Sequence, residues 1–554
     1  MVGAVIDFNG GVPDPARPVG IDVATREFLR AYFRFANQTQ FPALTPHAAA
    51  LGSFRDLAKE ENVAANRCIG VAESDGAALE EAGALLRYDP ALARHAWLRR
   101  RHGQRRYSLV GITHALSSNG AMEAIGALAT APMQSWDALI CPSYAIRNAA
   151  SIVLENWRGY LESRFGGTAQ TPLYLPVIPL GVDTVRFERI TEEAKRVTQR
   201  QRLGLADADV CVLYVGRLNL MAKANPLPLL LAAEQAAEQL ERRLVVVFNG
   251  YFNDTDNERA FAEAIKATCR KAEARIVLHG DVDFPDGVWA GADIFCSPID
   301  SIQESFGLTP IEAMAAGLPS IVSDWDGYRE TVRDGIDGLL VPTLAAPPGA
   351  GASLAWANFV TPGLYGDYLA ATSQSTAVDI EALARALHAL AANADRRRDM
   401  GATARRHARD SFDWSRIIRA YGTLLDELAE RRLSAPETGE GFGGIHPSHP
   451  DPFTMFAAFP SAHLDLGGRV ELAGLDWKRA IGRIGLKTGL VFADSLIDLE
   501  ELPFLIGQLE AVRGCTVEEL AQTLGLSDRA KLLRTLAWLV KLGICRYRAS
   551  LPPE

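Results

Sequence analysis

Between residues 207 and 345, short apolar runs alternate with amphipathic stretches, and this alternation constrains the fold more than any other feature of the sequence. Near-continuous apolar runs are typical of strands buried on both faces, and the stretches between them predict helices. The pattern therefore predicts a parallel sheet covered on both faces, whose ligands bind at the carboxyl ends of the strands. The apolar runs are DVCVLYVG (209–216), RLVVVFNG (243–250), RIVLHG (275–280), ADIFCSP (292–298) and SIVSD (320–324).

A second α/β unit with less regular elements is predicted over residues 1–188. Its strand-like runs include GAVIDF, SLVGITHA, DALICPS and PLYLPVIPLGVD, and a helix is expected over 21–37. Residues 344–376 look like an insertion with structure of its own, and helices follow over 379–434. The Gly-, Pro- and His-rich stretch SAPETGEGFGGIHPSHPDP then marks a boundary. A chain of 554 residues is too long for one core, so several domains are expected.

Composition excludes several classes of protein. A net charge of −10 argues against a general nucleic-acid binder, which would need excess Lys and Arg. The seven cysteines are scattered without zinc spacing, so we expect buried thiols in a reducing compartment and no bound metal. The first residues read as a strand and not as a signal peptide, and no apolar run reaches the roughly 20 residues that span a bilayer. A cytoplasmic or membrane-peripheral protein is predicted.

The segment QESFGLTPIEAMAAGLPSIVSDWDG holds two glutamates, Glu304 and Glu312, on either side of a glycine turn. One interpretation is structural: Thr309 caps a short helix that begins at Pro310, and Glu312 completes a capping box. The other is functional. The turn exposes backbone N–H groups at a positive helix end, which suits a phosphate, while carboxylates on either side bind hydroxyl groups. Taken alone, the segment favours the structural interpretation.

Two cations in YVGRLNLMAKANP change that balance. Arg217 follows the glycine that ends a predicted strand, and Lys223 lies before the next helix. A planar guanidinium and a compact ammonium together suit a diphosphate. Solvated loop cations are the plain alternative, but these lie on the same predicted sheet edge as the glutamates. The residues therefore predict a site for a nucleotide-sugar diphosphate.

The order of YVGRLNLMAK, LHGDV, ADIFCSP, QESFGLTPIEAMAAGLPSIVSD and DGLLVP resembles the retaining family 4 (group 1) glycosyltransferases. The resemblance covers roughly residues 1–430. It implies an α/β protein of the GT-B fold, in which two Rossmann-like domains face a cleft. It also implies an acceptor-side domain over 1–188, completed by helices at about 413–432, and a donor domain over 189–412.

The resemblance also implies roles for individual residues. Glu304 would contact the hydroxyl groups of the donor sugar, and Glu312 those of the ribose. Arg217 and Lys223 would hold the diphosphate, so that no metal is needed. The remaining positions are the β-phosphate and sugar contacts Ser305, Phe306, Gly307 and Leu308, and His114 of GITHALSS near the reacting sugar.

The sequence departs from this family near its start. The usual glycine pair between the first strand and helix has two candidates here, Gly10-Gly11 and Gly20. We expect Gly20 to contact the donor because it directly precedes the predicted helix.

The run RHAWLRRRHGQRRY (94–107) is densely basic within an acidic protein. A solvated helix face is the favoured interpretation. The alternative is a peripheral contact with anionic lipid or with a phosphorylated acceptor.

The C-terminal residues 436–554 resemble a small, mostly helical winged-helix domain, with helices over VEELAQTL and RAKLLRTLAWLVKLG and a wing that starts at ICRYRA. They hold 12 Lys and Arg against 15 Asp and Glu, a net charge of −3, so DNA binding is not expected. A protein partner, self-association or packing is predicted instead.

Together these observations predict a retaining, metal-independent glycosyltransferase. Its donor is a UDP-, GDP- or ADP-linked sugar that acts as co-substrate, and its acceptor is a glycan, a lipid or a small molecule. The alternative is a regulatory protein that binds a sugar nucleotide and acts through the winged-helix domain. Intact cations at the diphosphate position favour the enzyme, because a sensor need not stabilise a leaving group.

Overall fold

The structure is a computed structural model. It describes residues 3–8, 20–168, 170–223, 225–281, 284, 287–436, 446–474, 477–484, 492–526 and 528–550. The chain forms two compact units, Met1–Ile445 and His446–Glu554. All seven cysteines are free, and six of them are buried, while Cys269 is half-buried. No helix among these residues is long and apolar enough to cross a membrane.

The first sheet of the larger unit has six parallel strands in the order β3-β2-β1-β4-β5-β6. This is the doubly wound order, in which the chain starts at the centre and builds outward in both directions. The strands are β1 (Val5–Asp7), β2 (Phe41–Leu44), β3 (Cys68–Val71), β4 (Ala84–Leu86), β5 (Ser108–Ile112) and β6 (Ala138–Ile140). The helices are α1 (Gly20–Phe35), α2 (Ala48–Glu60), α3 (Gly76–Ala82), α4 (Ala93–His102), α5 (Asn119–Leu128) and α6 (Tyr144–Phe165).

One expected strand of this domain is absent. The run 172–183 forms only isolated parallel bridges, which are Ala138↔Tyr174, Cys141↔Val177 and Val182↔Asp413. It contains Pro172, Pro176 and Pro179, which lack the N–H that a continuous ladder requires. The prediction of a strand there was wrong for this reason.

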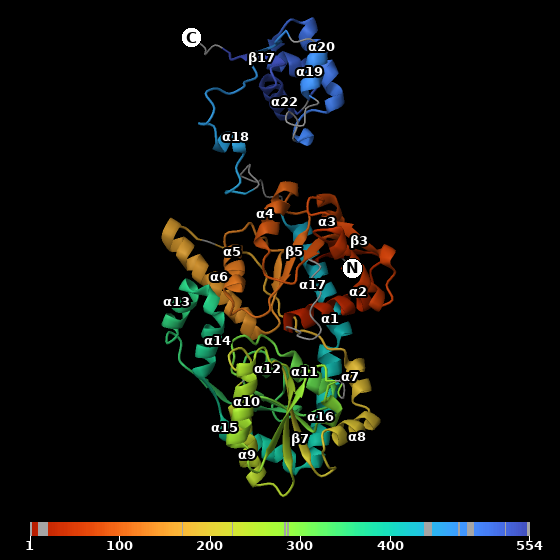
Figure 1. The fold of residues 1–554 in the computed structure, drawn as a ribbon, viewed down its shortest axis with the longest axis vertical. Helices are drawn as coiled ribbons and strands as arrows, with labels where there is room; N and C mark the ends of the chain where they lie inside the picture. The colour runs from red at the N-terminus through yellow and green to blue at the C-terminus, as the bar shows by residue number, and fades with distance from the viewer. Residues whose placement is uncertain are drawn as a thin grey trace. The chain divides into compact units, whose positions relative to one another are not determined.

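A helix from the far end of the unit completes the first domain. Helix α17 (Trp414–Ser434) packs beside α1, and its Trp414, Tyr421 and Leu428 lie in the same core as strand residues of the first sheet (Figure 1). The apolar stripe at a period of 3.6 residues explains which face of α17 is buried.

The second sheet has six parallel strands in the order β12-β11-β10-β7-β8-β9. Alternate residues of β7 belong to cores on opposite faces, because Cys211 and Leu213 pack on one side and Val210 and Val212 on the other. The strands are β7 (Val210–Val215), β8 (Leu244–Gly250), β9 (Glu273–Leu278), β10 (Ile294–Ser297), β11 (Ser320–Ser323) and β12 (Gly338–Val341). The helices are α7 (Thr184–Ile190), α8 (Glu193–Arg202), α9 (Pro226–Glu238), α10 (Thr255–Thr268), α11 (Leu308–Ala315), α12 (Tyr328–Thr331), α15 (Ile380–Ala392) and α16 (Ala394–His407).

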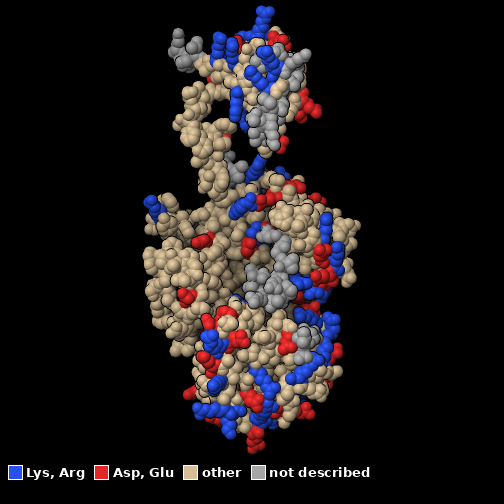
Figure 2. All heavy atoms as spheres, in the orientation of Figure 1, with Lys and Arg blue, Asp and Glu red and all other residues tan. Residues whose placement is uncertain are grey.

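Residues 343–378 form an insertion in the second domain. Strands β13 (Thr343–Ala345) and β14 (Thr376–Val378) pair antiparallel at its base and enclose α13 (Ala352–Val360) and α14 (Tyr365–Gln374). Asp367 is its only charged residue in the sequence. The surface over α13 and α14 in Figure 2 accordingly shows almost no blue or red. We call residues 343–378 the inserted segment.

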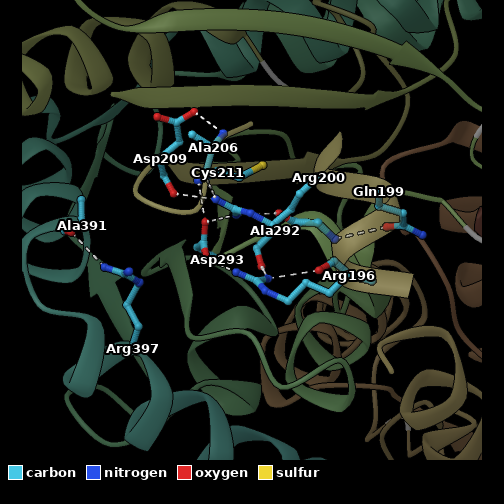
Figure 3. Close-up of polar contacts among 12 residues, drawn as sticks. Arg196, Gln199, Arg200, Ala206, Asp209, Cys211, Ala292, Asp293, Ala391 and Arg397 are labelled. Carbon is cyan, nitrogen blue, oxygen red and sulfur yellow. Dashed lines mark hydrogen bonds and ion pairs between the residues drawn. The ribbon is translucent and has the colours of Figure 1, made fainter. Parts of the chain in front are cut away.

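A polar network fastens helix α8 to the amino-terminal edge of the second sheet (Figure 3). Asp293, which precedes β10, accepts hydrogen bonds from Arg196 at 2.6 Å, Arg200 at 2.9 Å and the Cys211 amide at 2.8 Å. Arg200 also donates to the carbonyl oxygens of Ala206 and Asp209. Each group is paired, so we assign this network to stability.

The basic run 94–107 is only in part the solvated helix face that the sequence favoured, since Arg94, Arg101 and Arg106 are exposed but other cations are not. Arg99 on α4 is fully buried and donates to both carboxylate oxygens of buried Asp137, at 2.5 and 2.7 Å. Arg105 donates to the carbonyl oxygens of Arg432 and Leu433 at the end of α17. Arg99 and Arg105 therefore hold the first domain together, because they face a carboxylate and carbonyl oxygens that are distant in sequence.

The unit His446–Glu554 has a three-stranded antiparallel sheet in the order β16-β15-β17 and its own core. Helix α22 buries Leu532, Leu536 and Leu539 in that core, so its apolar face is used within the unit. The strands are β15 (Arg469–Leu472), β16 (Cys515–Thr516) and β17 (Cys545–Arg548). The helices are α18 (Pro452–Met455), α19 (Trp477–Ile484), α20 (Leu502–Ala511), α21 (Val517–Thr523) and α22 (Arg529–Lys541).

Candidate active site

The loops that follow the strands of the second sheet meet at its carboxyl edge, because all its strands are parallel. The loop after β7 carries Arg217 and Lys223, and the loop after β10 carries Glu304 and leads into α11. The loop after β5 of the first sheet carries His114. The predicted site residues, although far apart in the sequence, thus lie on a few loops at the carboxyl edges of the two sheets.

Lys223 and Glu304 form an ion pair at this edge. The Lys223 Nζ lies 2.8 Å from the Glu304 Oε2. Burial raises the pKa of Glu304. The charge and hydrogen bond of Lys223 lower it, as do hydrogen bonds from the amides of Ser305 and Phe306, and these effects outweigh burial. The pKa of Glu304 is therefore below its ordinary value. The site therefore holds a charged carboxylate next to a cation in a partly buried place.

Arg217 follows Gly216 at the end of β7, and its Nη2 donates to the Gln303 Oε1 at 2.5 Å. A guanidinium has five N–H donors, so this one bond leaves others for a ligand. Arg217 and Lys223 each contact a residue of the pair Gln303-Glu304. The structure thus brings together the two cations that the sequence predicted for one anionic group.

Helix α11 begins earlier than the sequence indicated. Its N-cap is Gly307, whose φ of +90° lies in the left-handed region, and no side chain caps the helix. A Cβ on Gly307 would lie 2.0 Å from the Tyr328 Cε1. The capping box of Thr309, Pro310 and Glu312 was therefore wrong. Because the glycine turn opens the helix, the first amides of α11 have no side-chain cap.

Glu312 is consequently free of a capping role. Burial raises the pKa of Glu312 to about 7, an effect opposed by the charge of Arg186 on α7 and strengthened by that of Glu27 on α1. Glu312 therefore faces charges from both domains of the larger unit. A half-buried carboxyl that titrates near neutral pH is typical of functional positions.

His114 follows β5, and its Nε2 lies 3.1 Å from the Tyr88 carbonyl oxygen, which can only accept. The Nε2 therefore carries the proton. Burial lowers the pKa of His114 to about 4, so the ring is neutral at physiological pH and its Nδ1 is an acceptor. Gly20 is the first residue of α1, while the rival pair Gly10-Gly11 lies outside the described residues.

Sequence reasoning missed Asp326 in the loop after β11. Its φ is +45°, its Oδ2 is buried with no described partner, and burial together with the Glu304 charge raises the pKa of Asp326 to about 8. Its Oδ1 lies 3.5 Å from the Ser143 Oγ, which donates to the Ser305 carbonyl oxygen at 2.9 Å. The only sequence signal for Asp326 was an Asp-Gly pair directly after a buried strand. Such a pair is first interpreted as a turn, so it did not indicate a functional residue.

Glu330 of α12 was also missed, and it bridges the two domains. Its carboxylate accepts hydrogen bonds from the amides of Tyr144 at 2.8 Å and Ala145 at 3.2 Å, at the amino end of α6. A carboxylate at a helix amino terminus is stabilised by the exposed N–H groups and the helix dipole. Among the residues that the structure describes, no cluster of His, Cys, Asp and Glu is arranged to hold a metal ion.

Comparison with known proteins gives a family match over part of the chain and similar solved structures. Residues 195–346 match the family model of "Glycosyl transferases group 1". The structure is similar to that of Anabaena HepE in complex with UDP, with a TM-score of 0.51 and 16% identity over 77% of this chain and 100% of that one. A glycosyltransferase from Rickettsia africae has a TM-score of 0.50 and 13% identity over 77% and 98%. The two six-stranded sheets thus have the GT-B arrangement.

A curated relative gives a closer sequence match over a shorter length. A D-inositol 3-phosphate glycosyltransferase of Geodermatophilus obscurus is 32% identical over 261 residues, which is 46% of this chain. The match spans 48% of that relative, so the chain spans about half its length. Residues 195–346 are therefore similar to the group 1 glycosyl transferases, and the two sheets share the GT-B fold of the solved structures.

Proposed function

We propose that the protein is a retaining glycosyltransferase that transfers a sugar from a nucleotide-diphosphate donor. The observation that carries this proposal is the Lys223–Glu304 pair beside the uncapped amino end of α11, with Arg217 on the same edge. This arrangement offers two cations and free amides to a diphosphate, and a charged carboxylate to sugar hydroxyls. The matched family segment, 195–346, contains all of these residues.

In the proposed reaction, the bond between the anomeric carbon and the diphosphate oxygen breaks while the acceptor oxygen bonds to that carbon on the same face. The O–H bond of the acceptor breaks in the same step, and its proton passes to the departing diphosphate oxygen. Arg217 and Lys223 stabilise the charge that develops on the departing diphosphate. Residues 305–308 contact the β-phosphate and the sugar, and Glu304 binds the sugar hydroxyls. Neutral His114 contacts the sugar from the first domain, and Gly20 approaches the diphosphate. The protein needs no metal for these steps.

The first test is release of nucleotide from a panel of UDP-, GDP- and ADP-linked sugars, with and without EDTA. Uridine is the first base to try, because the similar HepE structure is a UDP complex. We expect release with at least one donor, at the same rate in EDTA, because cationic side chains occupy the place of a metal. Activity that is lost in EDTA and restored by manganese would contradict the metal-independent part of the proposal.

Glu312 supplies a test based on pH. If Glu312 accepts hydrogen bonds from ribose hydroxyls, its carboxyl group must be deprotonated. The pKa of Glu312 is about 7, so this deprotonation occurs between pH 6 and 8. Affinity for a nucleotide sugar, whose diphosphate does not titrate in this range, should rise about threefold to tenfold as pH rises through 7. Glu312→Gln should flatten this rise, as measured by calorimetry. An unchanged pH profile in the variant would contradict the ribose contact.

The acceptor, which is a glycan, a lipid or a small molecule, and a cytoplasmic or membrane-peripheral location are part of the proposal. So do the domain bounds 1–188, 189–412 and 436–554 and the winged-helix assignment of the last domain. Three helices and a three-stranded antiparallel sheet around one core support that assignment. We infer that this domain serves docking or assembly, because its net charge is −3 and Arg529 on α22 is paired with Glu518.

Cleavage of the chain between residues 437 and 445 tests this inference. The larger fragment should still bind nucleotide, because α17 and both sheets lie before the cut. The smaller fragment should bind duplex DNA weakly and without sequence preference in a gel-shift assay. Light scattering should show whether its removal changes the oligomeric state. Tight, sequence-dependent DNA binding would instead favour the regulatory alternative.

A further inference from the structure

The inserted segment reaches the first domain through a polar contact. Asn358 is the buried residue of α13, and its Nδ2 donates to the Asn119 Oδ1 at 2.6 Å. The Asn119 Nδ2 in turn donates to the Asn358 carbonyl oxygen at 3.0 Å. Helix α13 thus turns its polar side chain inward and leaves Trp356 and Phe359 exposed. Because the buried side chain of this apolar helix is polar, the Asn358–Asn119 contact, and not apolar burial, determines where α13 lies.

Tyr365, at the start of α14, extends this contact to the donor side. Its hydroxyl lies 2.7 Å from the Oγ of buried Ser117, three residues after His114. The Gln303 Nε2 donates to the same hydroxyl at 3.4 Å, and the Gln303 Oε1 accepts from Arg217. Since the hydroxyl accepts from Gln303, its own proton is free to go to Ser117. The result is a continuous chain of hydrogen bonds, Ser117–Tyr365–Gln303–Arg217.

We propose that Tyr365 is a positioning residue that orients Gln303, and through it Arg217, and links both to the acceptor-side loop 113–118. Gln303 can satisfy Arg217 only through its carbonyl oxygen, which leaves its NH₂ group for a partner on the other side. Tyr365 is that partner. The inserted segment therefore couples the place of the diphosphate cation to the loop that carries His114. This proposal rests on the proposed donor site, because it gives Arg217 the diphosphate as its ligand.

The first experiment needs no nucleotide. Hydrogen exchange is measured on peptides that cover 113–119 and 216–222 in the full chain, in wild type, Tyr365→Phe and Tyr368→Phe. Tyr368 is the matched control, because it lies on the same helix and takes no part in the chain. We expect Tyr365→Phe to raise exchange about twofold to tenfold in both peptides, the range of one neutral hydrogen bond, and Tyr368→Phe to change neither. A change confined to 113–119, or in neither peptide, would overturn the link.

The second experiment compares UDP with UMP, which lacks the β-phosphate, by calorimetry. Tyr365→Phe should weaken UDP about twofold to tenfold and leave UMP unchanged. Gln303→Ala should weaken UDP similarly, and the double variant should bind like Gln303→Ala alone, because both changes interrupt one chain. Additive losses, or equal losses for UMP, would overturn the positioning role. If wild type bound no nucleoside diphosphate at all, the proposed function would fail, while the exchange result would still decide the link.

Discussion

Replacing Lys223 or Arg217 by alanine is expected to lower turnover about 10²- to 10³-fold, the range seen when one group that stabilises a developing anion is removed. Both cations lie at the sheet edge where the proposed diphosphate leaves, and Lys223 is 2.8 Å from Glu304. The rate of nucleotide release from the preferred donor measures the effect. Circular dichroism should show that the fold is retained, because both side chains lie on loops.

Lys266→Ala is the control for this prediction, because Lys266 lies in the last turn of α10 in the same domain. It removes an equal charge away from the site and should leave the rate unchanged. Lys223→Ala should also raise the pKa of Glu304, since the Lys223 charge is the main influence that lowers it against burial. Near-normal rates in both Lys223→Ala and Arg217→Ala would show that the diphosphate binds elsewhere.

Arg99→Ala is expected to lower the free energy of unfolding by about 3–5 kcal/mol, the usual cost of leaving one member of a buried ion pair without its partner. Asp137 would keep the bonds it accepts from the amides of Leu109, at 2.9 Å, and Gln134, at 2.8 Å, but would lose its cation. Its carboxylate is fully buried, so water cannot replace the guanidinium. Urea unfolding of the full chain measures the loss.

Arg101→Ala supplies the comparison, because Arg101 lies two residues away on α4 and is exposed. Its removal should change stability by no more than about 0.5 kcal/mol. Arg99→Lys should recover only part of the loss, because an ammonium cannot donate to both carboxylate oxygens in the parallel geometry of a guanidinium. Equal stability of Arg99→Ala and Arg101→Ala would contradict the structural role of the pair.

The second sheet could be predicted because its strands are buried on both faces. The run 209–216 gave β7 and the run 243–250 gave β8 within one or two residues, and the alternation of strands and helices indicated parallel pairing. Arg217, Lys223 and Glu304 follow such strands, so their place at one edge followed from the same pattern. The roles assigned to them were not in that pattern and remain predictions.

Other features depended on contacts that no local pattern contains. Gly307 opens α11 because Tyr328, 21 positions later, leaves no room for a side chain, whereas the local sequence offered Thr309 as a good cap. Arg99 looked like one charge among many, since its partner Asp137 is 38 residues away. The chain through Tyr365 joins residues 248 positions apart. Tertiary packing decided each of these outcomes.

The position of α17 has a consequence for synthesis of the protein on the ribosome. The strands of the first domain precede those of the second in the sequence, yet Trp414, Tyr421 and Leu428 of α17 fill part of the first domain's core. At about 5–20 residues per second, the nascent first sheet would wait for tens of seconds, with the apolar surface under α17 uncovered, until this helix emerges. The second domain, with its helices α15 and α16, is synthesised in that interval. The domain translated first is thus the later of the two to be completed.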